Sequence, residues 1–261
     1  MFAACFNPNP FLKKFPDEKN VWKINQQRIK GFLKFTTAAN KKSVSSINLK
    51  AARKIKKLND LGFITVDSQE GLHQEEKNPT YVTGEQEGQR LVNKEGSPAV
   101  LSINSERGYC DGFIRTELLD AFEAQLKACT PQAIVLRYPR EEGAERVNLT
   151  KEYIKYEDGS EYKNDFTNSP EYTRDDLQTY IIDIALRESG YYTGPPLPPM
   201  PIDLRRWTYI LAIDMDYGHH VLEKDGLFVC MEKALVASLK AARGGRRTMK
   251  KRVKPLRNNR A

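Results

Sequence analysis

The strongest constraint on the fold comes from residues 99–139, where the spacing of apolar side chains changes from a strand pattern to a helix pattern and back. Residues 99–103, 107–114 and 133–139 have the composition of β-strands. Between the second and third of these runs, apolar side chains recur at helical spacing at Leu118, Leu119, Phe122 and Leu126. A strand, a helix and a strand in this order predict a crossover unit and an α/β or α+β fold, a single mixed-sheet domain with helices.

Charge divides the chain into three blocks, which the net charge of +8 over 261 residues conceals. Residues 1–60 carry 14 Lys/Arg and 3 Asp/Glu, a net charge of +11. Residues 61–239 have a net charge of −13, and residues 240–261 carry 10 Lys/Arg with no Asp/Glu. An acidic body therefore lies between two basic ends, so the whole-chain charge does not indicate a uniform nucleic-acid binder.

These blocks predict the domain organisation. Residues 1–44, in which Phe and Trp alternate with Lys, Asn and Pro, are interpreted as an extended N-terminal arm. Residues 45–239 are the expected globular domain. Residues 240–261 are the basic C-terminal tail, which has few apolar residues and is expected to be disordered when alone.

Local signals within the globular domain predict several element boundaries. Ser45 or Ser46 is the expected cap of a helix that ends at Gly62, and residues 70–97 are expected to be loop with a short helix. Asp158-Gly159 predicts a β-hairpin, and a second hairpin is expected around Asp225-Gly226.

The turn Asp67-Ser68-Gln69-Glu70-Gly71 is the first candidate site. It could hold a nucleophile or bind a cation, but Asp and Ser also end strands by bonding to their own backbone. A serine hydrolase needs a general base, and the chain has only three histidines and no G-x-S-x-G segment. No phosphate-binding glycine motif is present either. The residues alone favour a structural turn, and no cofactor is expected.

A second candidate lies in the segment DMDYGHHVLE. Asp214 and Asp216 point to one face of an extended strand, and His219, His220 and Glu223 follow. Oxygen and nitrogen ligands of this kind can bind a metal, yet the spacing fits no defined metal motif. Charged residues that leave a strand for a glycine turn are also ordinary surface, so no metal is expected here.

The basic tail is a candidate contact region for nucleic acid or for an acidic protein face. Its expected contact residues are Arg243, Arg246, Arg247, Lys250, Lys251, Arg252, Lys254 and Arg257. A segment of this kind binds nucleic acid through counterion release, without sequence preference and with strong salt dependence. Charge alone does not choose between DNA, an acidic neighbour and a solubilising role.

Two segments resemble a poorly characterised family of large nucleocytoplasmic DNA virus proteins, which is distantly similar to a small bacterial domain of unknown function. The matching positions are Leu61, Gly62, Thr65, Asp67, Ser68 and Gln69, followed by Arg107, Tyr109, Gly112 and Phe113. Gly108 departs from the alanine of that family. The resemblance implies a shared polar feature, a ligand-binding set of Asp67, Ser68, Gln69, Arg107 and Tyr109, in which Arg107 bonds to Asp67 across adjacent strands.

Together these observations favour a non-enzymatic virus structural or virion-associated protein of the minor capsid or core type. Its expected partners are other virion proteins, and nucleic acid through the tail. The expected location is the host cytoplasm and the virion, not the secretory route, with no transmembrane segment and four reduced cysteines. The alternative is an intracellular enzyme or ligand-binding protein with a polar pocket near Asp67, Ser68, Gln69 and Arg107.

Overall fold

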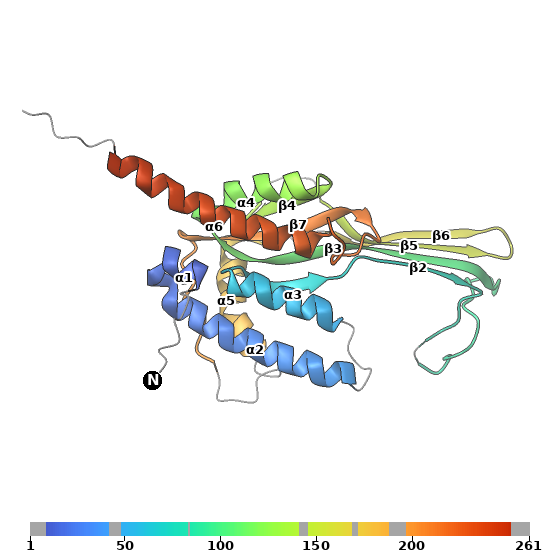
Figure 1. Cartoon of the computed structure of the whole chain (residues 1–261). Coiled ribbons are helices and arrows are strands. Elements are labelled where there is room, and N and C mark those ends of the chain that lie inside the picture. Colours follow the sequence, from blue (N-terminus) through green and yellow to red (C-terminus); the bar gives the residue numbers. More distant parts are fainter. Residues whose placement is uncertain are drawn as a thin grey trace, which may run out of the picture.

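A computed structural model describes residues 9–41, 48–82, 84–140, 146–168, 172–187 and 197–251, and it confirms an α+β single domain. Four helical segments come first, and strands and further helices follow (Figure 1). Before the long central strand lie α1 (Pro10–Lys14), η1 (Pro16–Glu18), α2 (Lys19–Lys41), α3 (Leu49–Asp60), β1 (Ile64–Gln69) and β2 (Leu72–Lys77). The remaining elements are β3 (Ala99–Arg115), α4 (Thr116–Cys129), β4 (Ala133–Tyr138), β5 (Asn148–Tyr156), β6 (Glu161–Asn168), α5 (Arg174–Arg187), β7 (Trp207–Tyr217) and α6 (Leu227–Lys251).

The sheet is organised around β3, which joins the two strands expected at 99–103 and 107–114 into one strand of 17 residues. The main strand order is β4-β7-β3-β5-β6, and β1 and β2 also pair with β3. The first half of β3 pairs with β2 and β5, and the second half pairs with β1 and β7. One strand therefore holds together a compact body and a projecting arm of β2, β3, β5 and β6 (Figure 1).

The crossover expected between residues 99 and 139 is present, and β7 lies between its two strands in the sheet. β3 and β4 both pair antiparallel with β7, so they run in the same direction, and α4 connects them. Every strand pair in the described part of the chain is antiparallel, which corrects the expectation of a mixed sheet. The hairpin expected at Asp158-Gly159 joins β5 and β6 and is confirmed. The loop expected over residues 70–97 contains β2 instead of a helix.

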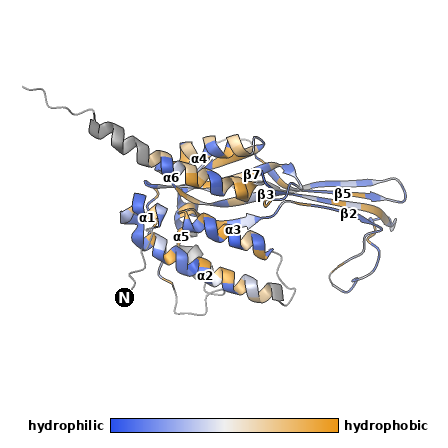
Figure 2. Ribbon diagram, in the orientation of Figure 1, coloured by the Kyte–Doolittle hydropathy of each residue, from blue (hydrophilic) through white to orange (hydrophobic). Residues whose placement is uncertain are grey.

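Side chains of alternating direction along the strands build the core on both faces of the body. On β4, Arg137 reaches Asp120 and Glu123 of α4, whereas the ring of Tyr138 lies on the other face against Tyr209. α4 and α6 pack against each other, α3 lies beside α6, and α2 packs on α3. Figure 2 shows hydrophobic stretches in α4, α6 and β7, in agreement with a core between these elements.

The predicted extended N-terminal arm is wrong for the described residues 9–41, which are helical and packed on the body. Asn9 caps α1, and the buried Phe11 ring contacts Trp207 of β7 at a centroid distance of 5.8 Å. Gly62, at φ 92°, leaves room for that ring, because a Cβ there would lie 2.0 Å from Phe11 Cδ2. Residues 1–8 and 42–47, which include Ser45 and Ser46, lie outside the described residues, and Asn48 caps α3.

The C-terminal predictions also need correction. Residues 225–227 do not turn between two strands, because α6 begins at Leu227. α6 then crosses the expected boundary at residue 240 and continues to Lys251, so this part of the expected disordered tail is helical. Cys129 and Cys230 form a disulfide between α4 and α6, against the expectation of reduced thiols; Cys110 is a buried free thiol. No helix in the described ranges is both long and apolar enough to cross a membrane.

Candidate functional site

A polar pocket of 540 Å³ lies where β1 turns into β2, and it contains most of the predicted ligand-binding residues. Asp67, Ser68, Gln69 and Tyr109 all line it. The other lining residues are Asn48, Glu70, Gly71, Leu72, Glu106 and His220. The turn expected from the sequence is thus one wall of a pocket as well as the end of β1. Three carboxylates face this space, so it suits a cationic or hydrogen-bond-donating ligand rather than a phosphate.

Two strands align a row of acidic groups beneath this pocket. The Tyr109 hydroxyl donates to Asp67 Oδ2 at 2.8 Å, and the Asp67 backbone N–H donates to Asp111 Oδ1 at 2.6 Å. Burial and the charge of Asp67 raise the pKa of Tyr109. Burial also raises the pKa of the Asp111 carboxyl to about 7, against the hydrogen bonds that lower it. The Tyr109 hydroxyl therefore stays protonated and holds Asp67 in place as a hydrogen-bond donor.

Arg107 does not belong to this group, and its predicted bond to Asp67 is wrong. It stands opposite Tyr217 of β7, and its guanidinium carbon lies 4.2 Å from the centroid of that ring. Its Nη1 donates to the Asn148 carbonyl at 2.9 Å. The register of β3 turns this side chain toward β7 and β5, so Tyr109, and not Arg107, bonds to Asp67.

The structure adds Glu106 and His220 to the pocket residues that were expected, and it includes Glu70 of the candidate turn. His220 Nε2 lies 3.0 Å from Glu70 Oε2, and the Gln69 side-chain amide donates to Glu106. Asp111, which supports the pocket from below, was also not anticipated; its position two residues after Tyr109 on one strand was the available signal. Among the described residues the Ser68 hydroxyl has no hydrogen-bonded base, so the pocket lacks the geometry of a serine nucleophile.

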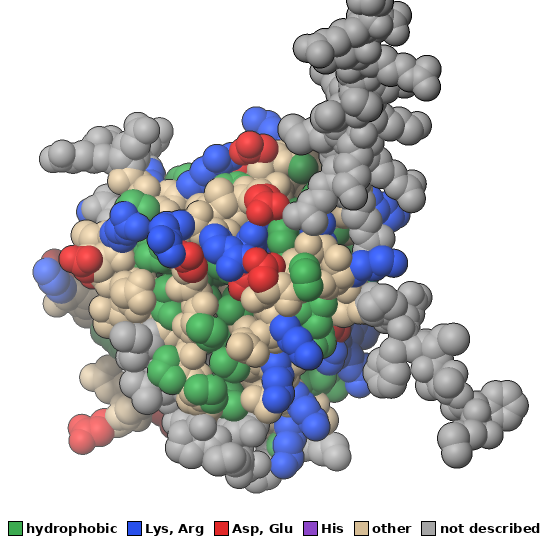
Figure 3. Space-filling model, turned by 90° about the vertical axis from the view of Figure 1, so that its left-hand side faces the viewer, with side chains coloured by type: hydrophobic (Ala, Val, Ile, Leu, Met, Phe, Trp, Pro, Cys, Tyr) green, Lys and Arg blue, Asp and Glu red, His purple; other side chains and the backbone are tan. Residues whose placement is uncertain are grey.

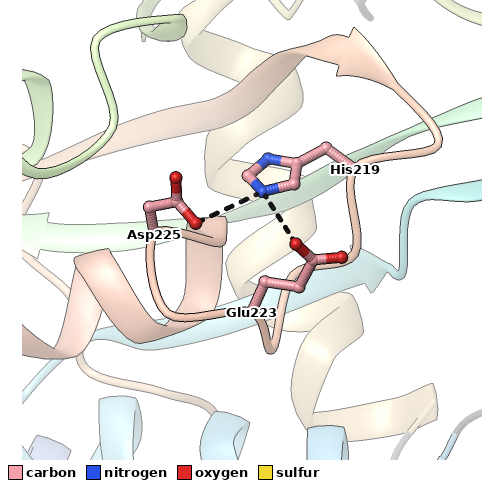
Figure 4. Close-up of side chains that lie close together, drawn as sticks. All are labelled: His219, Glu223 and Asp225. Carbon is pink, nitrogen blue, oxygen red and sulfur yellow. Dashed lines mark ion pairs between the residues drawn. The ribbon is translucent and has the colours of Figure 1, made fainter.

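The residues considered for metal binding separate into different surroundings. Asp216 is exposed, and His220 faces Glu70 in the polar pocket. Asp214 is fully buried, and its Oδ2 lies 2.5 Å from His219 Nδ1. His219 Nε2 lies 3.7 Å from a carboxylate oxygen of Glu223 and 3.7 Å from one of Asp225 (Figure 4). Asp214, Asp216, His219 and His220 therefore do not share one centre.

Glycines allow the turn that carries both histidines to approach the strands closely. A Cβ on Gly71 would lie 2.1 Å from the His219 carbonyl oxygen, and one on Gly226 would lie 2.5 Å from that of His220. A Cβ on Gly108 would lie 2.5 Å from Val221 Cγ1. Packing against Val221 thus favours glycine at position 108.

The basic tail residues fall partly within α6. Arg243, Arg246, Arg247, Lys250 and Lys251 lie on its last turns, and only the course of their backbone is described. Arg252, Lys254 and Arg257 lie outside the described residues. α1 packs beside α6, and Lys14 Nζ donates to the Ala242 carbonyl, so the start of the chain meets the beginning of the basic segment.

Comparison with known proteins adds no relative, because no protein-family model and no curated protein matches this chain.

Proposed function

We propose that this chain is a non-enzymatic structural protein of a virus particle, and that its cationic end binds the genome or an acidic neighbouring protein. The observation that carries the proposal is the set of exposed cations on α1, α2 and the start of α3 that folding leaves without acidic partners among the described residues. The resemblance of the segments around Asp67 and Tyr109 to viral proteins is the reason for placing this role in a particle.

Folding does not neutralise the basic N-terminal block. Among the described residues, seven exposed cations make no ion pair: Lys13, Lys19, Lys23, Lys30, Lys34, Lys50 and Arg53. Lys54, Lys56 and Lys57 of this block pair with acidic groups. The acidic Asp17 and Glu18 of this block bind Arg115 and Arg206 of the body, which leaves the block still more cationic toward solvent.

α1 and the basic last part of α6 lie at the same end of the molecule, and α2 runs from this end toward the arm side of the body. In Figure 1, α1 and the last part of α6 both lie on the left, away from the arm. Figure 3 looks onto this end and shows Lys and Arg side chains across it, with a run of them low on one side. Cations on one surface attract a polyanion by their electrostatic field. Contact between the two then releases counterions from the polyanion.

The nucleic-acid part of the proposal is tested by measuring binding of the full chain to double-stranded DNA as a function of salt. The test variant replaces the α2 lysines Lys19, Lys23, Lys30 and Lys34 with glutamine, and a second variant lacks residues 243–261. The matched control replaces four exposed arm lysines: Lys94, Lys151, Lys155 and Lys163. Four lost phosphate contacts should lower the slope of log K against log salt by about 3 to 4, whereas the control keeps its slope.

Three outcomes would overturn parts of the proposal. DNA binding with the same salt slope in all variants would reject the cationic end as the contact. Absence of DNA binding at low salt would reject the genome as partner and leave an acidic protein. Absence of the chain from purified particles would reject the particle role, whatever its affinity for DNA.

A second candidate function is binding of a small cationic ligand in the polar pocket. The supporting observation is the convergence of Asp67, Glu70 and Glu106 with Tyr109 and His220 around one space of 540 Å³. A ligand that binds only the folded state raises its melting temperature. Polyamines should raise it and nucleotides should not, and Glu106→Gln should reduce the rise. No rise with any of these compounds would reject this candidate.

A further inference from the structure

The geometry points to a binding site for a divalent transition-metal cation, with zinc as the type case, formed by His219 Nε2, Glu223 and Asp225. We infer that the buried Asp214 is the positioning residue that orients the histidine for this site. The inference is independent of the cationic end and of the polar pocket, because none of these four residues belongs to either.

The three ligand atoms come from one short turn between β7 and α6. His219 Nε2 lies 3.7 Å from Glu223 Oε2 and 3.7 Å from Asp225 Oδ1, and one ligand atom from each residue lies within 4.8 Å of the other two. Figure 4 shows both carboxylates directed at the same ring nitrogen. These separations exceed a hydrogen bond, but they approach the roughly 3.4 Å between neighbouring ligands of a tetrahedral ion with metal–ligand bonds of about 2.1 Å.

The proton arrangement around the ring leaves acceptors facing one another. Asp214 Oδ2, 2.5 Å from His219 Nδ1, accepts the proton of that nitrogen. In the neutral ring, Nε2 then carries a lone pair that points at two carboxylates. Three acceptors in this arrangement require a positive charge between them, either a metal ion or a second proton on the ring.

The surroundings of His219 match the support of a metal-bound histidine. Its side chain is fully buried, that of His219 is 16% exposed, and the Glu223 and Asp225 side chains are 60% and 66% exposed. Asp214 also accepts from the Asp216 backbone N–H at 3.0 Å, so its orientation is fixed. A carboxylate that holds the far nitrogen of a histidine is the usual support for a metal-bound imidazole. Solvent exposure of the two outer carboxylates gives an ion its entry path.

The donor set selects the class of ion. An imidazole nitrogen with two carboxylates suits zinc, manganese or iron(II) better than calcium or magnesium, which prefer oxygen ligands alone. Three protein ligands leave at least one position for water. A bound ion would tie the end of β7 to the start of α6, next to the Cys129–Cys230 disulfide.

The test is titration of untagged, chelator-treated full-length protein with zinc chloride, followed by calorimetry and by metal analysis after gel filtration. One zinc per chain is expected. His219→Ala should abolish binding, and Glu223→Gln and Asp225→Asn should each weaken it by about 10-fold or more. The matched controls are His73→Asn, a histidine on β2 whose Nδ1 lies 2.9 Å from Ser105 Oγ, and Asp120→Asn, an exposed carboxylate on α4, and both should bind as the wild type does.

The positioning role of Asp214 has its own readout. Asp214→Asn should weaken zinc binding by about 10- to 100-fold, and the ¹⁵N shifts of the His219 ring should show loss of the Nδ1–H tautomer. Because Asp214 is buried, this variant could fail to fold, and the two exposed carboxylate variants then carry the test. Absence of stoichiometric zinc binding, or binding that Glu223→Gln and Asp225→Asn leave unchanged, would overturn the inference.

Discussion

Replacement of Glu18 by glutamine should destabilise the protein strongly, because Glu18 anchors the N-terminal helices to the sheet through buried charges. Glu18 and Arg115 are 4% and 3% exposed, and Arg115 Nη1 donates to the Glu18 carboxylate. Arg206 Nη2 lies 3.0 Å from the same oxygen. The substitution leaves a buried guanidinium facing a neutral amide, and breaking a buried pair in this way costs about 3–5 kcal/mol.

The surroundings of Arg115 place the expected loss at the lower end of that range. Arg115 keeps a bond to Glu117 Oε1 at 2.9 Å, and its guanidinium lies 4.6 Å from the centroid of the Phe15 ring. We therefore expect Glu18→Gln to lower the free energy of unfolding by about 3 kcal/mol. Asp17→Asn is the matched control. Its side chain is 57% exposed and pairs with Arg206, so the loss should be under about 1 kcal/mol.

Urea unfolding followed by tryptophan fluorescence measures this difference, because Trp22 lies in α2 and the buried Trp207 lies in β7 next to Phe11. A loss below about 1 kcal/mol for Glu18→Gln, or a loss equal to that of Asp17→Asn, would refute the reasoning. In either case the N-terminal helices would not depend on this buried pair for their attachment.

Three further predictions concern the interior. The folded pKa of Asp111, about 7, lies above its unfolded value. The contribution of Asp111 to stability is therefore complete below about pH 4 and is lost as the pH rises to about 7. Asp111→Asn should remove this part of the pH dependence in denaturation curves measured from about pH 4 to 8. Reduction of Cys129–Cys230, which spans 101 residues, should cost about 2–5 kcal/mol and lower the melting temperature of the wild type but not of the double alanine variant. Gly108→Ala should cost about 1–3 kcal/mol by collision with Val221, and Val221→Ala should recover part of this in a double-mutant cycle.

The elements that the sequence predicted well are those with one clear apolar period. α4 buries Leu118, Leu119, Phe122 and Leu126 on one face, as their spacing indicates. The strand ended by Pro139 and the hairpin at Asp158-Gly159 also formed as expected. In each case the local pattern and the tertiary contacts favour the same structure.

The N-terminal helices were missed because their buried face is not apolar. α2 buries Asn25, Arg28 and Thr36 together with Val21 and Ile29, and this mixture obscures the helical period. Asn25 donates to Asn59 Oδ1 at 2.9 Å, and Arg28 donates to the Thr65 carbonyl. These partners lie 34 and 37 residues away along the chain, so no local pattern could reveal that the polar groups would be satisfied.

The candidate site was predicted in part for a similar reason. Asp67, Ser68, Gln69 and Tyr109 were identified from two short segments, and the structure places them around one pocket. The direction of the Arg107 side chain depends on the register of β3 against β7. The pairing of these two strands shifts between Arg107 and Tyr109. A change of one position in register reverses the face to which a side chain points, and sequence alone does not determine it. His220 and Glu70 meet only because the turn after β7 folds back over β1.

The continuity of β3 has a mechanical consequence. Its residues 99–106 belong to the projecting arm, and its residues 107–115 form the centre of the body, with no loop between them. A load applied along the arm therefore reaches Phe113 and Ile114 through one backbone, with the hydrogen bonds to β1 and β7 loaded in shear. β3 shifts its register against β7 beside Gly108, where the arm meets the body, so the arm should bend at this junction under load.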